Sequence, residues 1–434
     1  MPLAVLRRFT NRHAPKGSFR ANVLTLMTGT TIAQVIPIAV SPILSRIYTP
    51  HDYGIFALFM AVASLIFVIA TGRYEMAIML PDNDEEAINI VALSGTVTFF
   101  ISLITLLIVW IFNAAITSLI KNNEISKWLY CVPLAAFFTG IIQTLNYWLS
   151  RKKQYANLAI RRVYQSIATA GITIGMGLSG YGASGLIIAS IMGQGIAIGI
   201  MGWQVWREDG SKFGSVTKIK MIELAKRYKD FPRVNSLHVF VDMLQSSCVT
   251  FLISSFFGGA ILGAYSFAIR ILKSPTALIS ASVSQVFYQR ASETYNNSGN
   301  LPALLSKTMS RLALISFPIF IIIAIYAPNV FVILFGKNWK EAGIFAQILS
   351  PWILINFIVT PLSYIPAILH SQKAWFFVTL IGNTLPLLAI YYGGYIVKDI
   401  QIGLLLFSAL FTFSTLFEIN WIIRTARKRN CRIC

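Results

Sequence analysis

Long apolar runs, separated by short polar segments, follow one another along the whole chain. A membrane-spanning helix needs about 20 mostly apolar residues, and twelve stretches meet that requirement. They are 21–44, 54–72, 87–112, 128–149, 158–178, 183–206, 232–257, 263–289, 306–327, 342–369, 374–397 and 400–423. The runs are continuous rather than alternating, which excludes the strands of a transmembrane β-barrel. The pattern predicts an all-α polytopic membrane protein with about twelve transmembrane helices.

Composition agrees with this prediction. Of the 434 residues, 56% are hydrophobic and only 12% are charged, whereas about a quarter of a soluble protein is charged. The formal net charge of +20 would suit a nucleic-acid-binding protein, but the high hydropathy does not. We therefore expect no nucleic-acid partner, and the excess of positive charge needs another explanation.

Membrane topology supplies that explanation. If the N-terminus is cytoplasmic, 28 of the 36 Lys and Arg residues fall in inner segments, 6 fall in outer segments and 2 lie inside the eighth predicted helix. Basic residues concentrate on the cytoplasmic side of membrane proteins. This split predicts that both termini are cytoplasmic. The first apolar run is too long for a cleaved signal peptide and is interpreted as a retained first helix.

A basic polar segment near the middle of the chain separates six predicted helices from six. We expect an N-terminal six-helix lobe at 1–206, a cytoplasmic basic linker at 207–231, a C-terminal six-helix lobe at 232–423 and a basic cytoplasmic tail at 424–434. Transporters are commonly built from two such related bundles. Within the linker, Thr217–Tyr228 predicts a short amphipathic helix on the inner membrane surface.

Enzyme signatures are missing from the sequence. It contains neither a P-loop nor the motifs of serine hydrolases and zinc proteases, and its four His residues do not cluster. Cys431 and Cys434 form one C-x-x-C pair, which alone cannot complete a zinc site. The sequence therefore predicts a protein that is not an enzyme and has no cofactor and no metal site.

Charged residues inside the apolar runs are the stronger functional signal, because they are costly there and usually face a wet cavity or a partner. Arg270 and Lys273 share one helix face at i, i+3, and Pro275 follows them. Two such cations suit an anionic ligand such as pyrophosphate. The alternative is that both side chains reach back to the membrane interface.

Four further arginines are candidates with simpler explanations. Arg46 is either a cavity cation or an interfacial anchor, and Arg73 either pairs with Glu75 or meets a ligand headgroup. Arg161 and Arg162 are secondary candidates that positive-inside anchoring can also explain.

Two acidic positions could couple transport to an ion. Asp242 lies inside the seventh predicted helix with His238 one turn before it, and intramembrane Asp and His residues can relay protons. The alternative is a polar pair that only satisfies itself. Glu418, near the inner end of the last helix, is a secondary candidate for which a structural role is equally open.

Several segments of the chain resemble one bacterial family. These are Leu44–Leu58 (LSRIYTPHDYGIFAL), Arg73–Pro81 (RYEMAIMLP) followed by Asp84–Ala87 (DEEA), and Gly263–Arg270 (GAYSFAIR) running on to Val283–Phe287 (VSQVF). They resemble the signature regions of the oligosaccharide flippases, the O-antigen and capsule translocases of the multidrug/oligosaccharidyl-lipid/polysaccharide exporter superfamily. The predicted topology agrees with that family over the whole chain.

The resemblance implies a cargo, a location and a mechanism. It implies that an undecaprenyl-pyrophosphate-linked oligosaccharide repeat unit, for lipopolysaccharide or capsule, is flipped from the cytoplasmic to the periplasmic leaflet of the bacterial inner membrane. It also implies two lobes forming a V around a central cationic cavity, with ion-coupled alternating access. By matching positions it assigns Arg46, Arg73 and Arg270 to that cavity, whereas Lys273 and Asp242 rest on the physical argument. Its implied partners are membrane lipid, a polysaccharide polymerase and a chain-length regulator.

Two other functions stay open. A drug or cation exporter of the same superfamily would need acidic residues in the membrane, where this chain offers mainly Asp242 and Glu418. A membrane-embedded polysaccharide polymerase is disfavoured because no outer loop is large enough to carry a catalytic site.

Overall fold

The computed structural model describes residues 19–297, 300–369 and 371–430, and within these ranges it contains helices and no strand. The all-α prediction is confirmed. The helices are α2 (Phe19–Ile47), α3 (Pro50–Ile69), η1 (Tyr74–Met79), α4 (Asp84–Ile120), η2 (Asn123–Ile125), α5 (Ser126–Leu129), α6 (Val132–Arg151), α7 (Tyr155–Leu178), α8 (Ala183–Asp209), η3 (Gly210–Ser215), α9 (Lys218–Arg227), η4 (Phe231–Asn235), α10 (Ser236–Asn296), α11 (Leu301–Phe335), η5 (Lys337–Trp339), α12 (Lys340–Val359), η6 (Thr360–Tyr364), α13 (Ile365–Ile368), α14 (Gln372–Tyr392), η7 (Gly393–Val397) and α15 (Ile400–Asn430).

The number of membrane spans can be counted from helix length and composition, together with the break in α10 and the two arginines in α7. Among the described residues, nine helices are long and apolar enough to cross a membrane, or ten if the bent pair α5 and α6 forms one span. The long helix α10 is broken at Gly258, where φ is 83° and ψ is 176°, so it holds two of the predicted segments. The 24-residue helix α7 carries Arg161 and Arg162 and is not among the nine. With both arms of α10 and α7 counted, the helices correspond to the twelve predicted segments of a multi-pass membrane protein.

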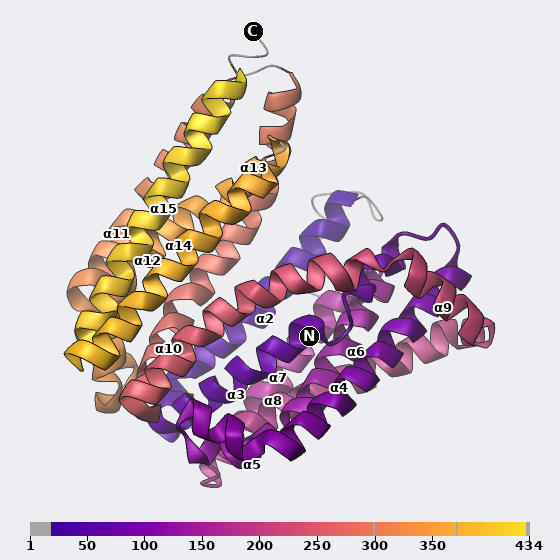
Figure 1. Cartoon of the computed structure of the whole chain (residues 1–434), viewed down its shortest axis with the longest axis horizontal. Coiled ribbons are helices and arrows are strands. Elements are labelled where there is room, and N and C mark those ends of the chain that lie inside the picture. Colours follow the sequence, from indigo (N-terminus) through magenta and orange to yellow (C-terminus); the bar gives the residue numbers. More distant parts are fainter. Residues whose placement is uncertain (1–18, 298–299, 370, 431–434) are drawn as a thin grey trace. The chain divides into compact units, whose positions relative to one another are not determined.

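The chain divides into two compact units, which we describe separately (Figure 1). Unit 1 comprises the described residues up to Tyr48 together with Ile55–Phe251, and unit 2 comprises Thr49–Gly54 and the described residues from Leu252 onward. The basic segment 207–231 lies within unit 1. The six-plus-six division into lobes with a free linker stays a prediction, as does the V around a central cavity.

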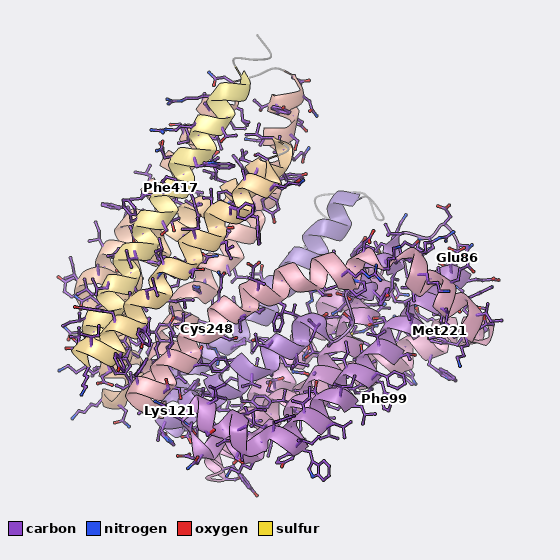
Figure 2. The ribbon with its side chains drawn as sticks, in the orientation of Figure 1. Glu86, Phe99, Lys121, Met221, Cys248 and Phe417 are labelled. Carbon is purple, nitrogen blue, oxygen red and sulfur yellow. The ribbon has the colours of Figure 1, made fainter. Side chains whose placement is uncertain are left out.

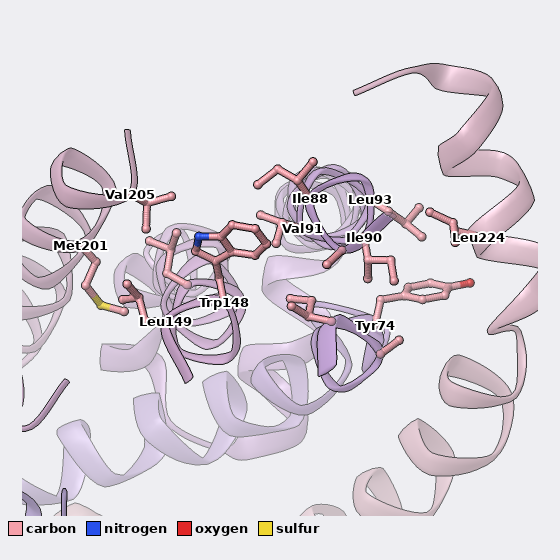
Figure 3. Packing of buried hydrophobic residues seen from close by; sticks show 14 of the residues in the cluster. Tyr74, Ile88, Ile90, Val91, Leu93, Trp148, Leu149, Met201, Val205 and Leu224 are labelled. Carbon is pink, nitrogen blue, oxygen red and sulfur yellow. The ribbon is translucent and has the colours of Figure 1, made fainter. Parts of the chain in front are cut away.

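Unit 1 has a core at the beginning of α4 (Figure 3). Helix α4 starts where the side chain of Asn83 accepts a hydrogen bond from the Glu86 N–H, and its first turn is acidic, which suits the positive end of a helix dipole. The next turns bury Ile88 and Ile90 against Trp148 of α6 and Leu224 of α9. The predicted amphipathic segment is therefore a helix, and one side of it belongs to this core.

Unit 2 contains an aromatic cluster around Phe267 of α10. The Phe267 ring centroid lies 4.1 Å from that of Trp339, 4.9 Å from that of Phe335 and 5.2 Å from that of Tyr53. Tyr53 stands in the first turn of α3, so only that turn belongs to unit 2, while the rest of α3 belongs to unit 1. Aromatic edge-to-face contacts of this kind add to simple area burial and hold the turn in place.

The first turn of α3 packs directly, backbone against backbone, on α10. A Cβ atom on Gly54 would lie 1.9 Å from the carbonyl oxygen of Gly259, and a Cβ atom on Gly263 would lie 1.6 Å from that of Pro50. No side chain can occupy either position without moving the main chain. In unit 1, the neighbouring Tyr48 is buried and donates a hydrogen bond of 2.7 Å to the carbonyl oxygen of Thr173.

We expect Gly263→Ala to destabilise the protein by roughly 1–3 kcal/mol or more, since the added methyl overpacks a backbone-to-backbone contact. Gly199→Ala is the matched control, because Gly199 also lies in a helix and a Cβ there meets nothing within 4 Å. The control should keep or slightly raise stability, as Ala is the better helix former by about 1 kcal/mol. Thermal unfolding in detergent, followed by size-exclusion chromatography, measures both. Equal melting temperatures for the two variants would contradict the close contact.

Candidate functional site

Arg73 lies in a strained loop between α3 and η1. Gly72 and Arg73 both have left-handed backbone angles, with φ of 57° and 60°. This conformation suits glycine but costs a residue with a side chain roughly 1–2 kcal/mol. The Arg73 N–H donates to the Thr71 hydroxyl over 3.2 Å. The loop therefore fixes the direction in which the Arg73 side chain leaves the main chain.

Glu75 is the buried partner of this loop. Its side chain is 1% exposed, accepts a hydrogen bond from the Thr71 hydroxyl and lies 3.6 Å from Nη1 of Arg73. The Arg73 side chain is 24% exposed and its buried Nε has no hydrogen-bond partner among the described residues. The predicted Arg73–Glu75 pairing is present, and Arg73 keeps donors that Glu75 does not use.

A charged cluster that the sequence did not reveal holds the segment between η1 and α4 against other helices of unit 1. Asp84 pairs with Arg151, Lys152 and Lys212, and the buried Asp209 lies 2.9 Å from Lys212 and accepts from Nε1 of Trp148 over 3.0 Å. Arg151 also donates to the carbonyl oxygens of Ile78 and Pro81, over 3.1 and 2.7 Å. The cluster thus ties the ends of α6 and α8 to the segment between η1 and α4. No sequence motif signals it, because its members come from separate parts of the chain.

Arg161 and Arg162 lie in the second turn of α7 but have different surroundings. Arg161 is 6% exposed, and its two terminal nitrogens have no hydrogen-bond partner among the described residues. Arg162 donates from Nη1 to the Thr30 hydroxyl of α2 over 2.7 Å. An arginine that only anchors the membrane surface keeps its head in water, so the burial of Arg161 does not fit simple anchoring.

Arg270 and Lys273 lie in the second arm of α10, in unit 2. Neither has a carboxylate within 4 Å among the residues that the structure describes, whereas Nζ of Lys273 lies 4.5 Å from the ring centroid of Trp352. An aromatic face attracts a cation without neutralising it. Among the described residues, no carboxylate is close enough to pair with either Arg270 or Lys273.

Arg46 and Arg73 do not share one binding position. Arg46 is exposed in the last turn of α2, directly before α3, whereas Arg73 follows the end of α3. The 20 residues of α3 give a rise of about 30 Å. One pyrophosphate group cannot contact both arginines at once. Their assignment to a cavity stays a prediction.

The candidate coupling residues Asp242 and Glu418 belong to different units. Asp242 is exposed in the first arm of α10, and the side chain of His238 lies outside the described residues, so their pairing stays a prediction. Glu418 of α15 is half-buried beside Gly382 of α14, where a Cβ would lie 3.1 Å from its Oε1.

The described residues contain no group of three or more His, Cys, Asp or Glu side chains that could hold a metal ion. Cys131 and Cys248 are free thiols. The C-x-x-C pair, Cys431 and Cys434, falls outside the described part of the chain.

Solved structures with a similar fold are membrane transporters. A structure described as the lipid II flippase MurJ in an inward closed conformation has a TM-score of 0.69 at 13% identity, covering 93% of this chain and 87% of that chain. An inward-facing multidrug resistance MATE family transporter of the MOP superfamily has a TM-score of 0.66 at 14% identity, covering 99% and 98%. A MOP superfamily transporter from Pyrococcus furiosus, described as having a binding pocket of reverse polarity, has a TM-score of 0.59 at 12% identity, covering 96% and 97%. This chain shares the fold of these proteins.

The family follows from the sequence match. The model of a family described as polysaccharide biosynthesis protein matches residues 43–343, which is well over half of the chain. The chain belongs to this family, and the resemblance stated from its sequence segments is confirmed. No curated protein matches the chain.

A double-mutant cycle separates a structural role of Arg73 from a role in binding. Arg73→Gln leaves the Glu75 carboxylate buried without its ion pair, and we expect it to destabilise unit 1 by roughly 1–3 kcal/mol. Arg73→Gln combined with Glu75→Gln should regain most of that stability. Thermal unfolding of the four proteins measures the coupling.

Transport activity is then measured in the same four proteins, to test whether Arg73 also contacts the cargo. If Arg73 also meets the cargo, the double variant regains stability but not transport. Recovery of both properties would show that Arg73 acts only through Glu75.

Proposed function

We propose that this protein is a flippase that moves an undecaprenyl-pyrophosphate-linked oligosaccharide repeat unit from the cytoplasmic to the periplasmic leaflet of a bacterial inner membrane. The observation that carries the proposal is the pair Arg270 and Lys273, two cations within a membrane-spanning helix with no carboxylate within 4 Å among the described residues. Membership of the polysaccharide biosynthesis family supports it. Both termini lie in the cytoplasm in this proposal.

The two cations in the span favour an anionic cargo on energetic grounds. Each charge at the centre of a membrane helix costs about 2.5–3.5 kcal/mol on insertion scales. A pyrophosphate offsets that cost, because a guanidinium can donate two parallel hydrogen bonds to it and an ammonium adds a point charge. The indole of Trp352 orients Lys273 and leaves its hydrogen-bond donors available.

In the predicted topology the cations stand at different depths. Arg73 lies at the inner end of α3 and Arg46 at the outer end, whereas Arg270 is about seven residues, roughly 10 Å, from the outer end of its helix. A headgroup crossing from inside to outside would meet them in turn during alternating access. Asp242 with His238, and secondarily Glu418, are the candidates for ion coupling, and Arg161 and Arg162 are secondary candidates for the cargo path. A polymerase and a chain-length regulator would take up the product.

A cation exporter is the competing function, because multidrug transporters have the same fold. A site for cations needs carboxylates, and unit 2 supplies Glu418 against Arg270 and Lys273 within its spans. The description of reverse pocket polarity in one MOP superfamily structure concerns that protein. That description agrees with the idea that the charge of the pocket, and not the fold, decides which ligand such a transporter binds.

We expect Arg270→Ala to abolish or strongly reduce flipping while the protein still inserts and folds. Losing one bidentate charge-assisted contact of roughly 1.5–3 kcal/mol corresponds to a fall of about 10- to 100-fold in apparent affinity. The assay uses proteoliposomes loaded with a fluorescent undecaprenyl-pyrophosphate oligosaccharide, and an impermeant reductant reads its transbilayer distribution.

Arg311→Gln is the control, because Arg311 is exposed in α11 and is not a candidate for the cargo site. Unimpaired flipping by Arg270→Ala, with normal folding, would contradict the assignment. Efflux of cationic drugs by the wild-type protein, with no effect on the labelled lipid, would favour the exporter instead.

A further inference from the structure

Helix α9 presents two chemically different faces, and only one of them is used within unit 1. Leu224 is 3% exposed and belongs to the core at the start of α4. The carbonyl oxygen of Ala225 accepts a hydrogen bond of 3.2 Å from the Tyr74 hydroxyl. Figure 2 shows Met221 of α9 and Glu86 of α4 in the same region of unit 1. This docked face explains why the helix is ordered.

Two of the basic residues of α9 belong to the docked face. Lys220 lies 3.6 Å from Glu85, and Arg227 lies 3.1 Å from Glu86, both in the first turn of α4. The charges of these two residues are therefore partly balanced within the protein, and they do not account for the basic character of the rest of the helix.

The opposite face has no partner among the described residues of unit 1. Ile219 is 80% exposed and Ile222 is 48% exposed, and Lys218 and Lys226 are exposed with no carboxylate within 4 Å among the described residues. At 100° per residue, these four side chains fall within an arc of about 100°. Exposed isoleucines between unpaired lysines are the composition of a helix that lies in a membrane interface.

The end of α8, which precedes α9 along the chain, carries two exposed tryptophans beside a basic residue. Trp203 and Trp206 are 65% and 70% exposed, and the guanidinium of Arg207 lies 5.4 Å from the Trp203 ring centroid. Exposed tryptophans beside basic residues are typical of the headgroup layer. The chain runs from here through η3 to α9.

A buried asparagine holds the beginning of α9 against α4. Asn89 of α4 donates to the carbonyl oxygen of Ser215 over 3.2 Å and accepts from the Thr217 N–H over 3.0 Å. The beginning of α9 is thereby held at the second turn of α4, where the apolar run of that span starts.

We propose that the face of α9 formed by Lys218, Ile219, Ile222 and Lys226 binds anionic phospholipid of the leaflet next to it. The two ammonium groups meet headgroup phosphates, and the two isoleucines enter the layer between the headgroups and the acyl chains. The occupant is lipid rather than a second copy or a soluble protein, because the face joins positive charge to exposed isoleucines, and exposed tryptophans precede it along the chain. The proposal does not depend on the identity of the cargo.

The test uses the full-length protein in nanodiscs that hold one copy each. The four native cysteines are replaced by Ser, and Ile219→Cys carries a polarity-sensitive fluorophore. Discs contain phosphatidylcholine alone or phosphatidylcholine mixed with phosphatidylglycerol. With the anionic lipid we expect a blue-shifted emission and a roughly twofold or greater fall in quenching by neutral acrylamide, both weakened at high salt.

Two charge-matched variants show which lysines act. Lys218→Gln with Lys226→Gln should lose the response to phosphatidylglycerol. Lys220→Gln with Arg227→Gln removes the same charge from the docked face and should keep it. Size-exclusion chromatography confirms that both variants remain folded.

Three outcomes would overturn the proposal. They are equal quenching in both lipid compositions, loss of the response in both variants, and shielding of the probe only in vesicles crowded with protein. The last outcome would identify a second copy as the occupant.

Discussion

Positive charge has to be stabilised wherever this chain passes through hydrocarbon, and that requirement governs most of the arrangement described above. A cation in a span can be paired with a carboxylate, placed over an aromatic ring, extended to the interface or left for a ligand. Lys273 takes the second course with Trp352, and Arg73, in the loop after the end of α3, pairs with Glu75. In the proposed topology, most of the basic residues outside the spans lie on the cytoplasmic side of the membrane.

Local signals predicted a large part of the structure. Continuous apolar runs located the helices because a span needs little more than length and hydropathy, and the i, i+3 spacing of Arg270 and Lys273 placed both on one helix face. The amphipathic pattern of Thr217–Tyr228 gave α9 correctly, but not that Leu224 is buried in a core. That burial depends on α4, which lies more than a hundred residues earlier in the chain.

Other features could not be predicted from a single sequence. The Asp84 cluster joins residues 67 and 128 positions apart, and no local pattern encodes such a pairing. The left-handed angle at Arg73 is imposed by the packing of the loop, because arginine itself disfavours it. Arg161 resembled an ordinary interfacial arginine in the sequence, and only its burial shows that its guanidinium is enclosed by protein.

The first turn of α3 has a consequence for how the protein is made. Thr49–Gly54 belongs to unit 2, although the chain on both sides of it belongs to unit 1. Its backbone contacts are with Gly259 and Gly263, so they can form only after α10 has left the ribosome and entered the membrane. Contacts that distant in sequence form slowly. This loop therefore has to wait for α10 before it reaches its native contacts, and until then the helices on either side of it persist without them.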